Sequence, residues 1–342
     1  MRVFFIYAGR RGSNLECAIA LWRIALGMGH DAHLVLSGDN ERREKVERLY
    51  PAAKFCNFLS PFGIGKLKKE IGGGVAFFTM VSPKMMPLFL SLRTKKVFYF
   101  HATYDNSYEK NTLSEKYFGM LHRIAINGAD CVVATQHPLA WQIRAQTGVE
   151  AGVLPHPPYS RIDARFFGED EKVDVPFEKY FLNFGEIGRA SKGTQVLLKA
   201  AQDGKLNVVL AGRHGEVRAG ENVFHLNRWV HDGELNYLVK NCQAVVLPYL
   251  LSSQFSGCLA LAYHFRKPVI APLSAAFEKD VLDGKSGLFF SQGDWEDLER
   301  KMLLVANGKI KFLPQNVQKK EKEMEKSTEK ALGEILERVG GQ

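Results

Sequence analysis

The 342-residue chain lacks the features that mark membrane-spanning, secreted and disordered proteins. No apolar run reaches the roughly 18 residues that a membrane-spanning helix needs, and the apolar stretch at Met1–Tyr7 is too short for a signal peptide. The five cysteines are scattered and no pair has CxxC spacing, which favours reduced core thiols over disulfides or a metal site. A hydrophobic content of 46% with 24% charged residues excludes a disordered chain. These absences predict a soluble, cytoplasmic protein of about two domains.

The excess positive charge belongs to the first half of the chain. Residues 1–165 hold 22 Lys and Arg against 13 Asp and Glu, whereas residues 166–342 hold 24 of each. Such a domain either has a solvated basic surface or binds an anionic partner, namely a phospholipid surface, a phosphorylated acceptor or nucleic acid. Nucleic acid is the weakest of these, because the sequence has no zinc finger, no RNP-like aromatic motif and no basic region with heptads.

Short apolar runs alternate with segments of helical period along the whole chain, which predicts an α/β fold of doubly wound parallel sheets. In the first half the expected strands are Arg2–Tyr7, Ala32–Leu36, Lys54–Phe58, Val75–Phe78, Lys96–Phe100, Cys131–Ala134 and Ala151–Leu154. In the second half they are Tyr180–Phe184, Asn207–Ala211, Val223–Leu226, Ala244–Leu247, Pro268–Ala271 and Gly287–Phe290.

Prolines and polar residues interrupt the alternation once. We therefore expect a Rossmann-like domain over 1–165, a linker over 166–178, a second Rossmann-like domain over 179–314 and a C-terminal helix over 315–342. The helix should be mostly exposed, because it has apolar residues at helical spacing only near its end, between Leu332 and Val339. Sheets of this kind bind ligands at the carboxyl ends of their strands, so the cleft between the two domains is the expected site.

Two strand ends in the second half have features that suit an anion. Residues 184–193 contain Gly185, Arg189 and Lys192 between a strand and a helix; the glycine allows close approach of a ligand and the two cations add positive charge. In residues 247–260 a helix begins near Ser256, where backbone N–H groups of Gly257 and Cys258 point outward. Ser256 alone would be read as a simple helix cap. Two such ends in one domain favour a nucleotide diphosphate.

The first half offers weaker candidates. The loop from Gly9 to Ser13 lacks the third glycine of a dinucleotide fingerprint, which disfavours a nicotinamide enzyme. His101 follows a strand, where an α/β domain places functional groups, although a histidine satisfied by local hydrogen bonds is the alternative. His137 and His156 also follow strands and are read as structural. No set of histidines or acidic residues has metal-ligand spacing, so neither a metal nor a cofactor is predicted.

Taken in order, five segments of the second half resemble the nucleotide-binding domain of GT-B-fold glycosyltransferases, in particular the retaining glycosyltransferase family 4. The segments are Phe181–Gly193, Val208–Gly212, Val230–Pro248, Arg266–Ala271 and Asp283–Leu288. The first half is similar only in outline, through its opening strand and loop, His101, and Leu154–Pro157.

The resemblance implies two facing Rossmann-like domains and transfer of a sugar from a UDP- or GDP-sugar with retained anomeric configuration and no catalytic metal. Lys192 and Arg189 would stabilise the departing phosphate, and His101 would contact the transferring sugar. The other donor-binding residues would be Gly12, Ser13, Gly185, Ser253, Ser256, Gly257 and Cys258. The expected acceptor is a glycan or a lipid-linked intermediate at the inner face of the membrane, with Tyr104 and Lys68 as its contacts.

One departure from the family pattern keeps other functions open. Many members carry two glutamates at the places of Ser253 and Leu261, although some relatives have a Ser-Gln-x-Ser-Gly type loop, which residues 253–257 resemble. The alternatives are a degenerate protein that binds a nucleotide sugar without turnover, and a GT-B-fold nucleotide-sugar epimerase.

Overall fold

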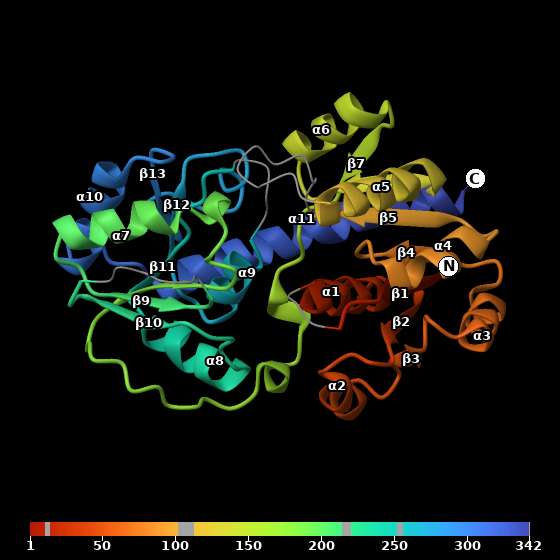
Figure 1. Cartoon of the computed structure of the whole chain (residues 1–342), viewed down its shortest axis with the longest axis horizontal. Helices are drawn as coiled ribbons and strands as arrows, with labels where there is room; N and C mark the ends of the chain where they lie inside the picture. Colours follow the sequence, from red (N-terminus) through yellow and green to blue (C-terminus); the bar gives the residue numbers. More distant parts are fainter. Residues whose placement is uncertain (11–13, 102–112, 214–219, 252–255, 342) are drawn as a thin grey trace. The chain divides into compact units, whose positions relative to one another are not determined.

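The computed structural model describes residues 1–10, 14–101, 113–213, 220–251 and 256–341 (Figure 1). These residues divide into two compact units. Unit 1 comprises residues 1–166 and 324–342, and unit 2 comprises residues 167–323. Each unit is built around one parallel sheet, so the predicted α/β class with two doubly wound sheets is confirmed.

Unit 1 has a seven-stranded sheet in the order β3-β2-β1-β4-β5-β6-β7, and every neighbouring pair is parallel. The strands are β1 (Arg2–Tyr7), β2 (Asp31–Ser37), β3 (Lys54–Cys56), β4 (Val75–Phe78), β5 (Lys96–Phe100), β6 (Cys131–Ala134) and β7 (Ala151–Val153). The helices are α1 (Asn14–Gly27), α2 (Arg43–Leu49), α3 (Pro61–Ile71), α4 (Met86–Ser91), α5 (Leu113–Gly128) and α6 (His137–Thr147).

One face of the unit 1 sheet packs against helices α3 to α6. Phe4, Ile6 and Ala8 point to this face and share one buried cluster with Leu88 of α4 and Ile143 of α6. The segment at residues 85–89 contributes four buried side chains to that cluster, those of residues 85, 86, 88 and 89. Burial of such apolar side chains contributes about 2 kcal/mol each, which is what holds the helices on the sheet.

Unit 2 has a six-stranded parallel sheet in the order β10-β9-β8-β11-β12-β13. The strands are β8 (Phe181–Phe184), β9 (Val208–Ala211), β10 (Val223–Leu226), β11 (Ala244–Val246), β12 (Val269–Pro272) and β13 (Gly287–Phe290). The helices are α7 (Thr194–Asp203), α8 (Asp232–Asn241), α9 (Gly257–His264) and α10 (Trp295–Ala306), and α7 and α10 pack on one face of the sheet.

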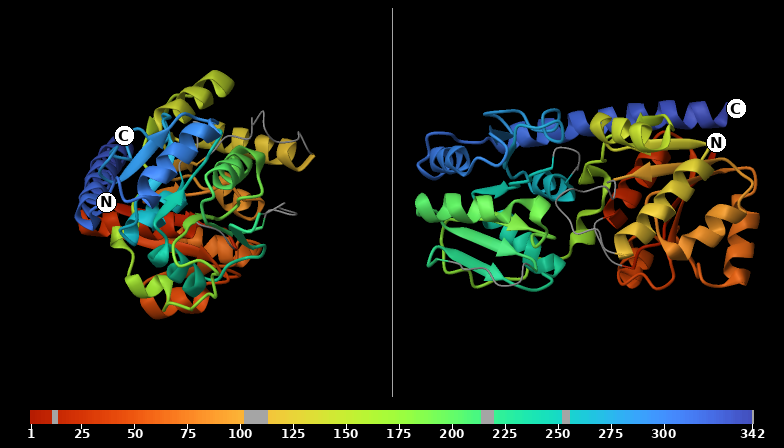
Figure 2. Two further views of the ribbon diagram at one scale, coloured as in Figure 1. Left: turned by 90° about the vertical axis from the view of Figure 1, so that its left-hand side faces the viewer. Right: turned by 45° about the horizontal axis from the view of Figure 1, so that its top comes forward.

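The C-terminal helix α11 (Pro314–Gly340), drawn in blue, begins in unit 2 and ends in unit 1 (Figure 2). Its last turns pack as the apolar spacing predicts, with Leu332 and Leu336 buried. The rest of the helix is mostly exposed or half-buried, but Val317, Met324 and Thr328 are also buried. These residues stand one or two turns apart among charged neighbours, so the sequence shows no continuous apolar stripe there.

Candidate functional site

The carboxyl ends of β8 and β11 form the point in unit 2 where the strand order reverses. In the sheet, β8 has β9 as its neighbour on one side and β11 on the other. The chain therefore leaves β8 and β11 toward opposite faces of the sheet. A crevice opens at such a point in doubly wound sheets, and ligands bind there. The two sequence segments predicted to bind a diphosphate are the loops that leave these two neighbouring strands.

Backbone contacts tie the two loops together. The N–H of Leu250 donates to the carbonyl of Ser191 over 2.8 Å. Gly193 has φ +65°, and a Cβ at this position would lie 1.8 Å from the carbonyl oxygen of Pro248. Glycine is therefore required at 193 both for the left-handed backbone and for the close approach of the second loop. Gly185, with φ +101°, makes a similar approach to the Cys258 side chain.

Lys192 lies at the junction of the two loops, next to the start of α9. Its Nζ is 3.8 Å from the centroid of the Tyr249 ring. The Tyr249 hydroxyl in turn lies 2.7 Å from the Oγ of Ser256, the residue that precedes α9. One short chain of contacts thus connects the lysine to Ser256, the residue before α9, and the donor-binding roles of Lys192, Ser256 and Gly257 stay predictions.

Ser256 does not act as the simple helix cap that its position suggested. Its side chain makes no capping bond, and it is buried with its hydroxyl turned to Tyr249. The amide groups of Gly257 and Cys258, in the first turn of α9, have no acceptor within the helix, as is general for first-turn amides. This N-terminus carries partial positive charge beside Lys192, an arrangement that suits an anion.

The Cys258 side chain is turned to the end of β8 and to Gly185. Its Sγ donates to the carbonyl of Phe184 over 3.3 Å. Burial raises the pKa of the thiol, although Lys192 opposes the shift. The side chain is therefore a neutral thiol, and the residue can serve a ligand only through its backbone amide.

Arg189 is more exposed than Lys192 and is paired within its own loop. Its Nε lies 3.2 Å from a carboxylate oxygen of Glu186, and half of the side chain is exposed. The positive charge of Arg189 is therefore shared with a carboxylate three residues earlier in the same loop. A partnered, solvated cation contributes less to an anion site than Lys192 does.

His101 follows β5 at the carboxyl edge of unit 1. Its Nε2 donates to the carbonyl of Thr79 over 3.1 Å, which fixes the neutral tautomer with the lone pair on Nδ1. Burial lowers the pKa of His101 to about 4, so the ring is uncharged at neutral pH. The His156 ring lies 5.8 Å away, and the sequence reading had treated it as structural only.

Four predicted residues lie outside the described part of the chain: Gly12, Ser13, Tyr104 and Ser253. Lys68 is half-buried on α3, and its role in acceptor binding stays a prediction.

Tyr249 was not predicted, although it organises the unit 2 site. A usable signal was present, because a tyrosine directly after a buried strand and Pro248 is placed at the carboxyl edge of the sheet. Its ring contacts Lys192 and its hydroxyl contacts Ser256, so one side chain positions both halves of the site.

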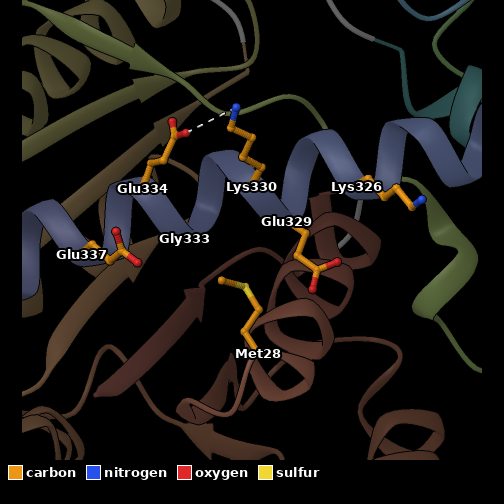
Figure 3. Close-up of a pocket in the computed structure, with 7 residues that line it drawn as sticks. All are labelled: Met28, Lys326, Glu329, Lys330, Gly333, Glu334 and Glu337. Carbon is orange, nitrogen blue, oxygen red and sulfur yellow. Dashed lines mark ion pairs between the residues drawn. The ribbon is translucent and has the colours of Figure 1, made fainter.

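Two pockets in unit 1 were also not predicted. The first, of about 400 Å³, lies beyond the ends of β2 and β3 and is lined by Ser37, Gly38, Asp39, Arg43, Asn57, Phe58, Leu59 and Lys84. The second, of about 470 Å³, lies where Met28 faces α11, whose lining side chains are lysines and glutamates (Figure 3). Lys330 and Glu334 are paired there at 3.9 Å. None of the predicted site residues lines either pocket.

Among the residues that the structure describes, no helix combines the length and the apolar character needed to cross a membrane.

Comparison with known proteins finds a family match within the second unit. Residues 178–307 match the family model described as glycosyl transferases group 1. No curated protein sequence matches the chain significantly. Solved structures resemble the whole chain at low identity. HepE from Anabaena, in complex with UDP and glucose, has a TM-score of 0.67 at 13% identity, with all of both chains covered.

Two further structures give the same fold. Sucrose-phosphate synthase from Thermosynechococcus elongatus has a TM-score of 0.68 at 12% identity, covering 100% of this chain and 99% of its own. A TarM variant of S. aureus, in complex with fondaparinux, α-GlcNAc-glycerol and UDP, has a TM-score of 0.66 at 10% identity, covering 99% of each chain. The chain thus has the GT-B fold, and its residues 178–307 match the family model of glycosyl transferases group 1.

Proposed function

We propose that the protein transfers a hexose from a nucleotide-sugar donor to a glycan or lipid-linked acceptor, with retention of the anomeric configuration and without a catalytic metal. The observation that carries the proposal is the convergence of Lys192 with the N-terminus of α9 at the switch point of unit 2. A UDP-sugar is the first donor to test, because the HepE structures are complexes with UDP and with UDP-glucose.

The chemical contribution of unit 2 is to stabilise the leaving group. When the bond between the sugar carbon and the diphosphate oxygen breaks, its electron pair goes to the diphosphate. The Lys192 ammonium and the first amides of α9 are held in place by Tyr249 before the reaction. Groups preorganised in this way stabilise the developing charge without reorganising, and the loss of one such donor costs about 3 kcal/mol of barrier.

His101 is proposed to contact the transferring sugar from unit 1. Because Nε2 donates to Thr79, a sugar hydroxyl would donate to the lone pair on Nδ1. The low pKa of the ring is compatible with this role, since a protonated ring would have no acceptor.

The basic unit 1 is proposed to bind the acceptor. Its pocket beyond β2 and β3 includes Arg43, paired with Glu47, and Lys84, paired with Asp39, and an anionic group of the acceptor would compete for these two cations. Leu59 and Phe62 are 70% and 83% exposed, and the second is on α3 beside exposed lysines at 66 and 69. An apolar tip with basic neighbours is typical of a surface that lies on anionic lipid, which motivates the lipid-linked acceptor and a peripheral location at the membrane.

The test of the proposal compares Lys192→Ala with Lys199→Ala. Both lysines stack on an aromatic ring of unit 2, but Lys199 belongs to α7 and lies over Trp295, the first residue of α10. We expect Lys192→Ala to lower the rate of UDP-sugar hydrolysis or transfer at least about tenfold, with an unchanged fold by circular dichroism, and Lys199→Ala to retain the rate. Equal rates in the two variants would contradict the role of Lys192.

The same assay separates the two other functions. Tight binding of UDP-sugars and GDP-sugars without any turnover would identify a degenerate binding protein, because Ser253 and Leu261 replace the family glutamates. Recovery of a sugar with altered configuration still attached to the nucleotide would identify an epimerase.

A further inference from the structure

Three side chains of metal-ligand type meet in unit 1. Cys17 comes from α1, His101 follows β5 and His156 follows β7, so they are 84 and 55 positions apart along the chain. The Cys17 sulfur and one ring nitrogen of each histidine all lie within 4.8 Å of one another. Within the described ranges this is the one group of at least three such side chains that the geometry brings together.

The hydrogen bonds of the two imidazoles match those of metal-binding histidines. His101 donates from Nε2 to the carbonyl of Thr79, and His156 donates from Nδ1 to the carbonyl of Pro157 over 2.9 Å. Carbonyl oxygens only accept, so each ring has its proton on the named nitrogen and its lone pair on the other. A backbone carbonyl that holds one ring nitrogen while the other binds a metal is the usual second-shell arrangement of ligating histidines.

The identity of the ligands selects the class of ion. One sulfur and two imidazole nitrogens suit a thiophilic cation such as Zn²⁺, whereas Mg²⁺ and Ca²⁺ prefer oxygen ligands. Bond lengths of about 2.3 Å to sulfur and 2.0–2.1 Å to nitrogen require ligand atoms roughly 3.5 Å apart. The ligand atoms, which lie within 4.8 Å of one another, therefore need to approach by at most about 1.3 Å on binding. On binding, the S–H bond of Cys17 breaks, a bond from sulfur to the metal forms and the proton goes to water.

The burial of the three groups leaves one side for a fourth ligand. Cys17 and His156 are buried, whereas His101 is only partly buried at the carboxyl edge of the sheet. Three protein ligands with an open fourth position are typical of zinc sites that exchange water or another ligand.

We propose that Cys17, His101 and His156 form a binding site for Zn²⁺ in unit 1. The site has a consequence that rests on the proposed function: a metal bound to Nδ1 of His101 removes the lone pair offered to the sugar hydroxyl. Zn²⁺ then inhibits glycosyl transfer instead of assisting it.

The experiment titrates the reduced full-length protein with Co²⁺, which reports thiolate ligation through a charge-transfer absorption band. We expect one Co²⁺ per chain with this band, and loss of the band when Zn²⁺ is added but not when Mg²⁺ is added. Cys17→Ser should abolish the band. Cys242→Ser is the matched control, because Cys242 is an equally buried thiol in unit 2, and it should keep the band.

Two further variants serve as a second test of the metal ligands and as a control for the transfer site. His156→Gln should weaken Co²⁺ binding at least about tenfold, and it replaces Cys17→Ser if that variant does not fold. Lys192→Ala should bind Co²⁺ as the unaltered protein does, which separates the metal site from the proposed transfer activity. The absence of a band in the unaltered protein, or a band of equal strength in Cys17→Ser and Cys242→Ser, would overturn the proposal.

Discussion

The carboxyl edges of the two sheets differ in how they are built. The edge of unit 2 consists of two loops joined through their backbones, with Lys192 beside a helix N-terminus. The edge of unit 1 brings together neutral side chains from distant elements, namely Cys17, His101 and His156. The net charge is distributed the other way: the whole excess of +9 lies in residues 1–165, although the cationic site is in unit 2. An anion site therefore depends on local geometry, and the net charge of a domain says more about its outer surface.

The largest expected effect breaks the loop junction of unit 2. Gly193→Ala places a Cβ about 1.8 Å from the Pro248 carbonyl oxygen at a left-handed backbone position. We expect a loss of stability on the order of 3 kcal/mol, since steric overlap adds to backbone strain. Unfolding in urea, followed by circular dichroism, measures it, and UDP binding measured by calorimetry should be lost at the same time.

Gly308→Ala is the matched control for this substitution. Gly308 also has a left-handed backbone, with φ +67°, but a Cβ there meets no atom within 4 Å. Strain alone should cost about 1 kcal/mol and leave UDP binding unchanged. If both variants lose the same stability and both bind UDP, the close approach of Gly193 to Pro248 is not what holds the two loops of unit 2 together.

The next effect is a pH dependence of opposite sign in the two units. Burial lowers the pKa of His122 in unit 1 to about 4, and burial raises the pKa of Asp280 in unit 2 to about 6. Below pH 6.5 the unfolded chain binds a proton at residue 122 that the folded chain does not bind, so His122 alone lowers the stability of unit 1 by about 2 kcal/mol between pH 7 and pH 5. His101 and His156, whose pKa values burial lowers to about 4 and about 3, act in the same direction. At residue 280 the folded chain binds the proton first, so unit 2 gains about 1 kcal/mol over the same range.

Hydrogen exchange at pH 7 and pH 5, corrected for the intrinsic chemical rate, resolves the two units. His122→Gln should lower the pH dependence of unit 1 by about a third, because His101 and His156 still titrate there, and Asp280→Asn should flatten that of unit 2 alone. A shift of the same sign in both units would show that the surface charge of the whole chain determines the response.

Strands and glycine-containing loops are easier to predict from the sequence than clusters of side chains from distant elements. All thirteen strands were expected near their observed places because parallel strands buried on both faces are short continuous apolar runs, as Val75–Phe78 and Val208–Ala211 are. The loop at Gly185–Gly193 was also found from the sequence, since glycine and lysine at a strand end have a local signal. The cluster of Cys17 with His156 has no such signal, because its members are far apart in the sequence and only the strand order brings them together.

Tyr249 is a side chain that lies within a site built mainly from backbone. Its substitution tests how much this side chain contributes to ligand binding at the carboxyl edge of unit 2. Tyr249→Phe keeps the ring under Lys192 but removes the bond of 2.7 Å to Ser256. The released Ser256 hydroxyl can then cap α9 and occupy an amide that the diphosphate needs. We expect UDP to bind about fivefold more weakly, in line with about 1 kcal/mol for one hydrogen bond, and kcat to change little because Lys192 stays in place.

Tyr263→Phe provides the comparison for that substitution. Its hydroxyl also bonds a serine of unit 2, Ser286, at 2.9 Å, but from the other end of α9. Both variants should lose about 1 kcal/mol of stability, and only Tyr249→Phe should weaken UDP binding in calorimetry. Equal UDP affinity in the two variants would mean that the backbone of the two loops is sufficient to form the anion site, and that the edge of unit 2 owes nothing to the tyrosine that links its parts.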